Sequence, residues 1–432
     1  MGNIMKVMGW VVVLSGVIGM GGCASVPSAE VGAVTQPAGG GDEAATQPVG
    51  GVVFNSVLKL EVSVRKNPGD FWSSLGRTPA TEPLVIPAGY TWLVELRGGN
   101  TVAQLAQEVR AKSIPGIILP TDAGDDELAK VKELKSLRTL SLGSTKVTDV
   151  GLVQLKGLTS LESLNLNHTV VTDAGLAPLR ELKCLQELFL SDTQVTDAGL
   201  ASLRELKYLQ ELLLSDTQVT DAGLVHLKEL KNLRTLDLGR TKVADAGLAQ
   251  LKELQSLQAI DLVQTPVTDA GLVYLKELKN LQTLKIGYTK VTDAGLTQLK
   301  ELKNLQELNL GGTKVTDAGL VQLKEFRNLR ELDLGNTQVT DAGLVQLKEL
   351  KNLRELNLWN TPVTDVGLAQ LKDLTGLRTL ELESSQVTDT GLVHLKELKG
   401  LRRLSLRFTP VTQAGADELR KALPECSITN GR

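Results

Sequence analysis

A spacing of 24 residues governs most of this chain and restricts what it can fold into. The pentapeptide Val-Thr-Asp-Ala-Gly at residues 171–175 returns unchanged at 195–199, 219–223, 267–271, 291–295, 315–319 and 339–343. An aliphatic residue recurs in phase at Leu142, Leu166, Leu190, Leu214, Leu238, Leu262, Ile286, Leu310, Leu334, Leu358, Leu382 and Leu406. Copies at a fixed spacing, without insertions, indicate structural units that stack on one another. At 432 residues the chain also exceeds what one compact core usually supports.

The sequence of one unit predicts its geometry. Residues 329–351 read LRELDLGNTQVTDAGLVQLKELK. The alternating leucines predict a short parallel strand, and Leu344, Leu347 and Leu350 fall on one stripe of a helix that faces the same core. Neither element can bury its leucines alone, so stacking is required. We therefore predict an α/β solenoid with parallel strands on the concave face and helices on the convex face.

The pattern LxxLxLxx(T)xVTDxGLxxLxxL resembles leucine-rich repeats over roughly residues 114–432. It is most similar to the cysteine-containing type found in F-box-protein substrate receptors, and to bacterial exported proteins with the same short unit. Leu182 stands near the place where that type has a buried cysteine. The resemblance implies a right-handed, horseshoe-shaped solenoid of about twelve repeats over residues 116–432, ending in a C-terminal cap, and a role in binding proteins or peptides.

Threonine replaces the usual asparagine after the strand, as at Thr145, Thr169 and Thr193. We expect its hydroxyl to satisfy buried backbone groups and to form a ladder along the stack.

The N-terminus is typical of an exported protein. Lys6 precedes an apolar run from Val11 to Met20, so residues 1–22 are predicted to be a signal peptide. Cys23 follows Gly21-Gly22 and resembles a bacterial lipoprotein processing site, which implies lipidation of Cys23 and anchoring in the cell envelope. Ordinary signal cleavage and an uncleaved anchor are the alternatives. Residues 23–51, rich in Ala, Gly, Pro and Thr, are predicted to be a disordered linker.

Residues 52–115 are predicted to form a small β-rich cap on the first repeat. Leu58–Arg65 has the alternation of a strand, and the segments 84–86 and 92–96 are predicted to pair as a hairpin. A helix is expected over Val102–Lys112, followed by a short strand over Ile114–Leu119.

The recurring aspartate has a structural and a chemical interpretation. It stands just before each helical pattern, which is the preferred N-cap place. Predicted structural N-caps are Asp173, Asp197, Asp221, Asp245, Asp269, Asp293, Asp317 and Asp341. The alternatives are a row of calcium ligands or catalytic carboxylates. Against them, the calcium-binding Gly-Gly-x-Gly-x-Asp repeat is absent, and catalysis needs two carboxyls in different environments.

No other sequence pattern predicts chemistry. Catalytic triads, phosphate-binding loops and zinc spacings are absent from the sequence, and a net charge of −3 provides no basic field for nucleic acid. His226 and His394 share one exposed helix position, whereas His168 at a strand end is a candidate contact residue. We predict a non-enzymatic protein without cofactor or metal.

Function is expected where the repeats differ on the concave face. The residue between the two strand leucines varies most, and exposed aromatics and arginines often anchor interfaces. Predicted partner-binding residues are Phe189, Leu213, Asp237, Asp261, Lys285, Tyr288, Asp333, Trp359, Glu381, Glu383 and Arg407. The predicted partner is a protein or peptide. The alternatives are a structural envelope component that binds cell-wall polymer or self-associates, and an enzyme with its site in residues 52–115.

Overall fold

The computed structural model describes residues 51–67 and 70–431. The predicted signal peptide, Cys23 and nearly all of the predicted linker lie outside these residues. The chain divides into two compact units: unit 1 comprises the residues up to 165 together with 181–185, and unit 2 comprises 166–180 and the residues from 186 to the C-terminal end. This division falls inside the repeats, and the boundary at residue 115 stays a prediction.

Unit 1 begins with antiparallel strands. β2 (Leu60–Arg65) pairs with both β3 (Ser73–Thr78) and β5 (Thr91–Leu96). β4 (Leu84–Ile86) pairs instead with β1 (Val52–Phe54), so the predicted hairpin between residues 84–86 and 92–96 is wrong. The physical reason is that β2 occupies the edge of β5 over its whole length, with Leu60 opposite Leu96 and Arg65 opposite Thr91.

A helix then leads into short parallel strands. α1 (Val102–Lys112) begins at Thr101, whose side chain accepts a hydrogen bond from the Gln104 amide, and the predicted helix is confirmed. β6 (Gly116–Ile118) lies parallel to β5, and the series continues in register through β7 (Thr139–Ser141) and β8 (Ser163–Asn165). Between them lie α2 (Asp125–Ala129) and α3 (Asp149–Leu152).

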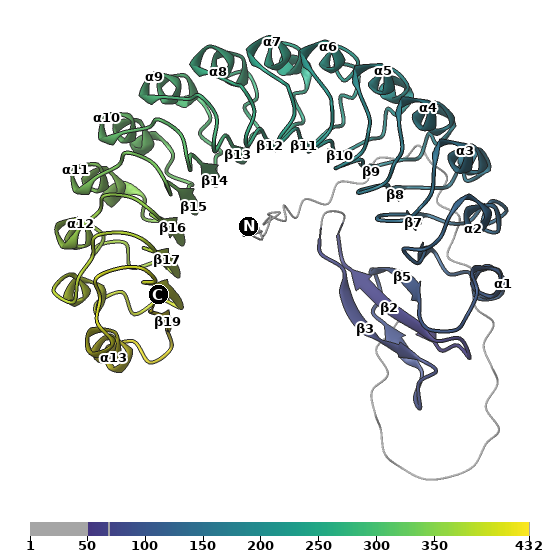
Figure 1. Ribbon diagram of the computed structural model, residues 1–432, viewed down its shortest axis with the longest axis horizontal. Coiled ribbons are helices and arrows are strands. Elements are labelled where there is room, and N and C mark those ends of the chain that lie inside the picture. Colours follow the sequence, from purple (N-terminus) through teal and green to yellow (C-terminus); the bar gives the residue numbers. More distant parts are fainter. Residues whose placement is uncertain (1–50, 68–69, 432) are drawn as a thin grey trace, which may run out of the picture. The chain divides into compact units, whose positions relative to one another are not determined.

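Unit 2 stacks strands and helical segments in an arc, with strands on the inner side and helices on the outer side; between β17 and β18 the helical segment is a 3-10 helix, Gly391–Leu395 (Figure 1). The strands pair in parallel with a constant offset of 24 residues. They are β9 (Glu187–Phe189), β10 (Glu211–Leu213), β11 (Thr235–Asp237), β12 (Ala259–Asp261), β13 (Thr283–Lys285), β14 (Glu307–Asn309), β15 (Glu331–Asp333), β16 (Glu355–Asn357), β17 (Thr379–Glu381), β18 (Arg403–Ser405) and β19 (Ser427–Thr429).

The helices of unit 2 are short, and a 3-10 turn follows many of them. Leu344, Leu347 and Leu350 are all fully buried, although only Leu344 lies in the α-helical turn. The helices are α4 (Asp173–Leu176), α5 (Asp197–Leu200), α6 (Asp221–Leu224), α7 (Asp245–Leu248), α8 (Asp269–Leu275), α9 (Asp293–Leu296), α10 (Asp317–Leu320), α11 (Asp341–Leu344), α12 (Asp365–Gln370) and α13 (Gln413–Ala422). The predicted inward stripe is confirmed, and the core is aliphatic.

The threonine after each strand binds within its own repeat. Thr337 Oγ1 donates to the carbonyl of Leu334 at 2.6 Å, and Thr313 does the same to Leu310. The hydroxyl therefore satisfies a buried backbone carbonyl, as predicted. The predicted ladder is wrong, because each bond closes inside one repeat.

The helix cap is threonine, so the predicted aspartate N-caps are wrong. Thr340 has the extended backbone of a cap residue, and its hydroxyl accepts a hydrogen bond from the Ala342 amide at 3.3 Å. Asp341 is the first residue inside the helix. The same shift of one residue applies to Asp173, Asp197, Asp221, Asp245, Asp269, Asp293, Asp317 and Asp341.

The aspartate instead binds the following repeat. Asp317 Oδ1 accepts from the Thr340 amide at 2.7 Å, and Oδ2 accepts from the Thr340 hydroxyl at 2.6 Å. We call this two-bond contact the clasp. In unit 2 it joins Asp173 to Thr196, Asp197 to Thr220, Asp245 to Thr268, Asp269 to Thr292, Asp293 to Thr316, Asp317 to Thr340, Asp341 to Thr364, Asp365 to Thr388 and Asp389 to Thr412.

The glycine of the motif makes room for the clasp. A Cβ on Gly343 would lie 2.3 Å from Asp317 Oδ1, and one on Gly295 would lie 2.4 Å from Asp269 Oδ1. Every residue of Val-Thr-Asp-Ala-Gly except the exposed alanine therefore has a structural role. The valine is buried in the core, and the threonine caps the helix and donates to the clasp. The aspartate accepts the clasp bonds, and the glycine leaves space for the aspartate of the preceding repeat.

Ala244 interrupts the series and provides a test. Asp221 keeps only its bond to the Ala244 amide, at 2.6 Å, and the helix that begins at Asp245 has no side-chain cap. Ala244→Thr should restore both the second clasp bond and the cap, and raise the free energy of unfolding by about 1–2 kcal/mol.

Denaturant unfolding measures the gain. Ala246→Thr is the matched control, because Ala246 is exposed in the same helix and joins no clasp; it should give no stabilisation. Equal effects of the two substitutions would contradict the role of the clasp.

Candidate binding surface on the inner strands

The outward side chains of each strand of unit 2 flank one buried leucine or isoleucine. In β15, Leu332 is buried, whereas Glu331 and Asp333 on either side of it face away from the core. Parallel pairing in register places equivalent residues of neighbouring repeats about 4.8 Å apart. The inner face therefore consists of rows, each formed by the same position in successive repeats.

The third residues of the strands form one row, which we call the third-residue row. From β9 to β18 it comprises Phe189, Leu213, Asp237, Asp261, Lys285, Asn309, Asp333, Asn357, Glu381 and Ser405. Most of these side chains are half-buried. Beyond this row, Trp359 and Glu383 are half-buried, Arg407 is exposed, and Tyr288 is 47% exposed. The predicted binding residues thus lie on the inner face, but they are spread over nine of the repeats from β9 to β18, and their binding role stays a prediction.

One residue in the turn after each strand has a positive φ. These residues form a further row, which we call the turn row. It comprises His168, Asp192, Asp216, Arg240, Gln264, Tyr288, Gly312, Asn336, Asn360, Ser384 and Phe408. Glycine, asparagine and aspartate adopt this conformation readily, whereas Tyr288 and Phe408 do so at a cost of about 1–2 kcal/mol. Tyr288 lies over Gly312, where a Cβ would come within 2.4 Å of the ring. Two exposed aromatic rings are therefore held in strained turns on this surface.

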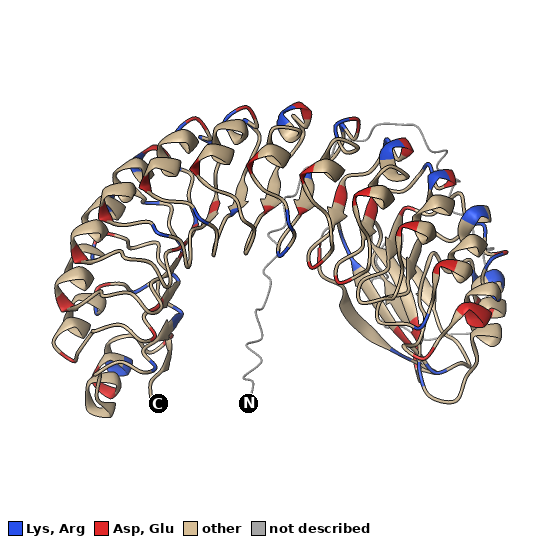
Figure 2. Ribbon diagram, turned by 45° about the horizontal axis from the view of Figure 1, so that its top comes forward, with Lys and Arg blue, Asp and Glu red and all other residues tan. Residues whose placement is uncertain are grey.

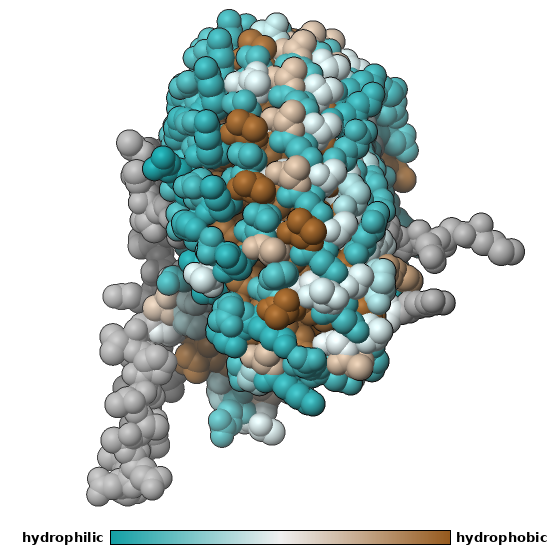
Figure 3. Space-filling model, turned by 90° about the vertical axis from the view of Figure 1, so that its left-hand side faces the viewer, coloured by the Kyte–Doolittle hydropathy of each residue, from teal (hydrophilic) through white to brown (hydrophobic). Residues whose placement is uncertain are grey.

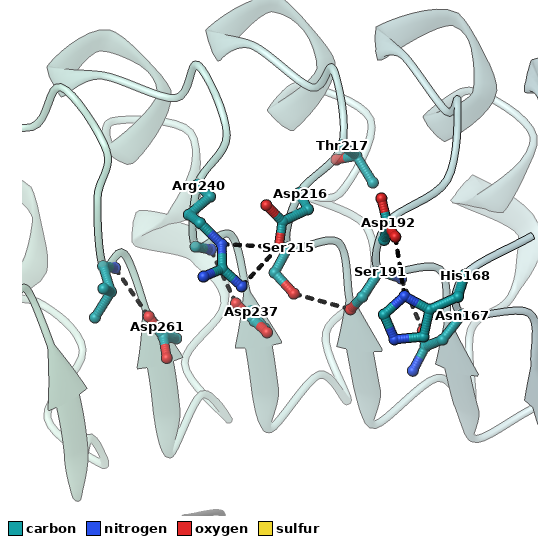
Figure 4. Close-up of polar contacts among 12 residues, drawn as sticks. Asn167, His168, Ser191, Asp192, Ser215, Asp216, Thr217, Asp237, Arg240 and Asp261 are labelled. Carbon is teal, nitrogen blue, oxygen red and sulfur yellow. Dashed lines mark hydrogen bonds and ion pairs between the residues drawn. The ribbon is translucent and has the colours of Figure 1, made fainter. Parts of the chain in front are cut away.

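Polar contacts run sideways along the turns (Figure 4). His168 Nδ1 lies 2.9 Å from Asp192 Oδ2, and Arg240 Nε donates to Asp216 Oδ2 at 2.8 Å. Both pairs are well exposed, so each contributes less than about 1 kcal/mol. The predicted contact residue His168 is therefore an accessible surface side chain.

The first residues of the strands form a second row that sequence reasoning missed. This first-residue row contains Glu307, Glu331 and Glu355 in three consecutive repeats. The signal was present, because strand alternation places the residue before a buried leucine on the same face as the residue after it. The predicted binding residues instead lie between the two strand leucines or beyond the second one.

Burial and mutual repulsion perturb these glutamates. Burial raises the pKa of Glu331 to about 7, and the carboxylates of Glu307 and Glu355 add to the rise. Lys285 lies 3.2 Å from Glu307, and both side chains are largely buried. Burial nevertheless raises the pKa of Glu307, and the attraction of Lys285 only partly offsets it. At Glu331 the attraction of Lys285 and Arg330 does not offset burial and the repulsion among these carboxylates.

The aspartates of the third-residue row are perturbed in the same way. Burial raises the pKa of Asp333 to about 6, and burial with the nearby charge of Asp237 raises that of Asp261 to about 6. Asp333 Oδ1 accepts a hydrogen bond from the Gly335 amide at 2.9 Å.

Asparagine makes the same turn in the flanking repeats. Asn309 Oδ1 accepts from the Gly311 amide, and Asn357 Oδ1 from the Trp359 amide, each at 2.9 Å. Asp333 between them makes its bond at the same distance. A neutral amide oxygen therefore makes the same bond as the carboxylate of Asp333, so the turn does not require a charge at this position.

Charges of both signs are spread over the helices and strands of unit 2 (Figure 2). The outer face carries a line of separate apolar side chains among polar ones (Figure 3). Val321 and Val393 lie in the 3-10 helices and are 39% and 52% exposed. The perturbed carboxylates belong to the inner strands, which makes the inner face the stronger candidate for binding.

Within residues 51–67 and 70–431, no group of three or more His, Cys, Asp or Glu side chains is placed to hold a metal ion. In the same ranges no helix has the length and apolarity needed to cross a bilayer.

Two family models match parts of the chain. One, described as Leucine Rich repeats (2 copies), matches residues 303–346. The other, Leucine Rich repeat, matches residues 133–156, 157–179 and 229–251. Both models describe leucine-rich repeats, and neither is the model of a catalytic family. A search of curated proteins finds no match.

Solved structures share the fold at low identity. An internalin from Listeria monocytogenes is 22% identical with a TM-score of 0.52, and the match covers 70% of this chain and 92% of that one. A leucine-rich-repeat protein from Leptospira interrogans is 23% identical with a TM-score of 0.51, covering 78% and 88%. An internalin C2 from Listeria monocytogenes is 31% identical over 48% and 83%, with a TM-score of 0.40. The chain carries leucine-rich repeats and has the leucine-rich-repeat fold.

Proposed function

We propose that the inner face of unit 2 binds a protein partner and that cationic side chains of the partner sit over the carboxylates of β12 to β17. The observation that carries the proposal is the charge on Asp333. The turn does not need that charge, because Asn309 and Asn357 make the same bond without it. Burial disfavours the charged form of Asp333. Binding of a cation by this carboxylate would explain why the position carries an acid.

The glutamates of the first-residue row support the same partner chemistry. Glu331 lies between Glu307 and Glu355, and Lys285 is already paired with Glu307. A lysine or arginine of a partner would neutralise the repulsion among these carboxylates. It would also lower the pKa of Glu331, so binding should strengthen as the pH rises through the value of about 7.

Apolar residues of the same face would anchor the partner. Phe189 and Leu213 lie side by side on β9 and β10. Trp359 and the strained Tyr288 supply aromatic surface near the carboxylates. Aromatic side chains at partly buried positions commonly dominate interface energetics. In this proposal the carboxylates select the partner and the aromatic residues contribute affinity.

Asp333→Asn tests the cost of the charge. An acid whose folded-state pKa lies above its unfolded value binds more protons when folded, so its contribution to stability falls as the pH rises through that window. For Asp333 the window runs from the ordinary value of 3.8 to about 6. Asp333→Asn should therefore raise the free energy of unfolding by about 2–3 kcal/mol near pH 8, and by only about 1 kcal/mol near pH 4.5.

The mirror substitution is the control. Asn309→Asp introduces a carboxylate with the same bond in a neighbouring repeat, and it should lower stability near pH 8. Denaturant unfolding at both pH values measures the two variants. A pH-independent gain from Asp333→Asn would contradict the account.

Binding is tested with a labelled dodecalysine peptide by fluorescence anisotropy. Its affinity should rise between about pH 5 and pH 8, because the perturbed carboxylates ionise there, and Glu331→Gln with Asp333→Asn should weaken it about tenfold. The control pair, Glu301→Gln with Glu349→Gln, removes two exposed carboxylates outside the strands. Equal loss in both pairs would show general electrostatic attraction only and would overturn the proposed site.

We also propose that the protein is exported and anchored in the cell envelope through lipid on Cys23. The support is the sequence alone: Lys6, the apolar run of residues 11–20, and Gly21-Gly22 before the cysteine. Mass spectrometry of the mature protein should find an N-terminal Cys23 heavier by its acyl chains. A free N-terminus beyond Cys23 would contradict the anchor.

A further inference from the structure

Four arginines form a row beside the glutamates. Arg330, Arg354, Arg378 and Arg402 each precede the first residue of a strand, in four consecutive repeats, and all four are exposed. Their backbones are joined, since the amide of each donates to the carbonyl of the one before it at 2.7 Å. We call this set the arginine row. The backbone positions that carry these side chains are about 5 Å apart from one repeat to the next.

Other repeats show that the fold does not need charge at this position. Gln210 Nε2 donates to Gln186 Oε1 at 3.1 Å, and Gln306 Nε2 donates to Gln282 Oε1 at 2.6 Å. Glutamine thus forms a side-chain ladder between repeats. Arginine has no acceptor and cannot continue that ladder, and neighbouring guanidinium groups repel one another.

Within the described residues, the four arginines form no ion pair with a carboxylate of the chain. Arg402 donates to the backbone carbonyls of Lys399 and Leu401. In the part of the chain that the structure describes, the side chains of Arg330, Arg354 and Arg378 have no ion-pair or hydrogen-bond partner. Their forked guanidinium groups therefore remain available for carboxylate or phosphate.

Two rows of opposite charge thus lie side by side. Arg330 directly precedes Glu331, and Arg354 directly precedes Glu355. The backbone keeps the two rows adjacent along these repeats, because the carbonyl of Arg330 accepts from the amides of both Arg354, at 2.7 Å, and Glu355, at 2.9 Å. A uniformly anionic polymer laid on the arginines would also face the glutamates and be repelled by them. A polypeptide can carry both signs, one along each edge.

We propose that the arginine row and the first-residue row together bind one extended segment of a protein partner, whose carboxylates lie over the arginines and whose cationic side chains lie over the glutamates. This inference rests on the proposed function and defines the partner segment as charged on both edges. An extended peptide with alternating glutamate and lysine meets that requirement, because successive side chains point to opposite sides.

Fluorescence anisotropy with the full chain tests the pairing. The probes are an alternating glutamate–lysine dodecapeptide, dodecalysine, and inorganic polyphosphate. The variant is Arg330→Gln, Arg354→Gln and Arg378→Gln, which introduces the residue that other repeats already carry there. The control is Lys324→Gln, Lys348→Gln and Lys372→Gln, which removes the same charge from exposed positions outside the strands.

The arginine variant should bind the alternating peptide about tenfold more weakly than the wild type, while dodecalysine binds equally or more tightly. The lysine control should bind both peptides as the wild type does. Unchanged binding of the alternating peptide by the arginine variant would overturn the inference. The inference would also be overturned if polyphosphate bound more tightly than the alternating peptide and this binding were lost in the arginine variant, because the partner would then be a polyanion. If dodecalysine does not bind the wild type while the alternating peptide does, the proposed function is refuted. The arginine row would then be the sole determinant of peptide binding.

Discussion

The carboxylate that joins each repeat to the next is the interaction on which this structure depends. One aspartate accepts hydrogen bonds from the amide and the hydroxyl of a threonine in the following repeat, as Asp317 does from Thr340. Hydrogen bonds to an ionised acceptor are stronger than neutral ones. The bonds also fix the offset between repeats, so the strands pair without slippage and every side-chain position is copied along the stack.

Copying makes each repeat a reference for its neighbours. Leucine and valine fill the core positions in nearly every repeat, so a change at an outward position alters the surface and leaves the packing intact. Asn309 and Asn357 accept the same turn hydrogen bond as Asp333 without carrying a charge. The glutamine ladders show that neutral side chains can occupy the positions of the arginine row. Both comparisons indicate charge that the fold does not require. Under the proposed function, these departures from the repeat mark the surface that binds the partner.

The sequence predicted the solenoid because leucine spacing alone decides which residues face inward. It misassigned the aspartates because an anion at a helix start suits both a cap and a contact to another repeat, and only coordinates show where the carboxylate points. The hairpin prediction failed for a related reason: β4 and β5 are close in sequence, but β2 takes the edge of β5. The perturbed pKa values of Glu331 and Asp333 arise from burial on the inner face, which no residue spacing reveals.

A double-mutant cycle on Asp269 and Gly295 tests the clasp most directly. In the wild type, a methyl group on Gly295 would lie 2.4 Å from Asp269 Oδ1. Gly295→Ala should therefore cost about 2–4 kcal/mol of unfolding free energy alone, and much less when Asp269→Ala has removed the carboxylate. A coupling energy of about 1.5 kcal/mol or more is the predicted result. Additive effects of the two substitutions would contradict the claim that the glycine exists to receive the clasp.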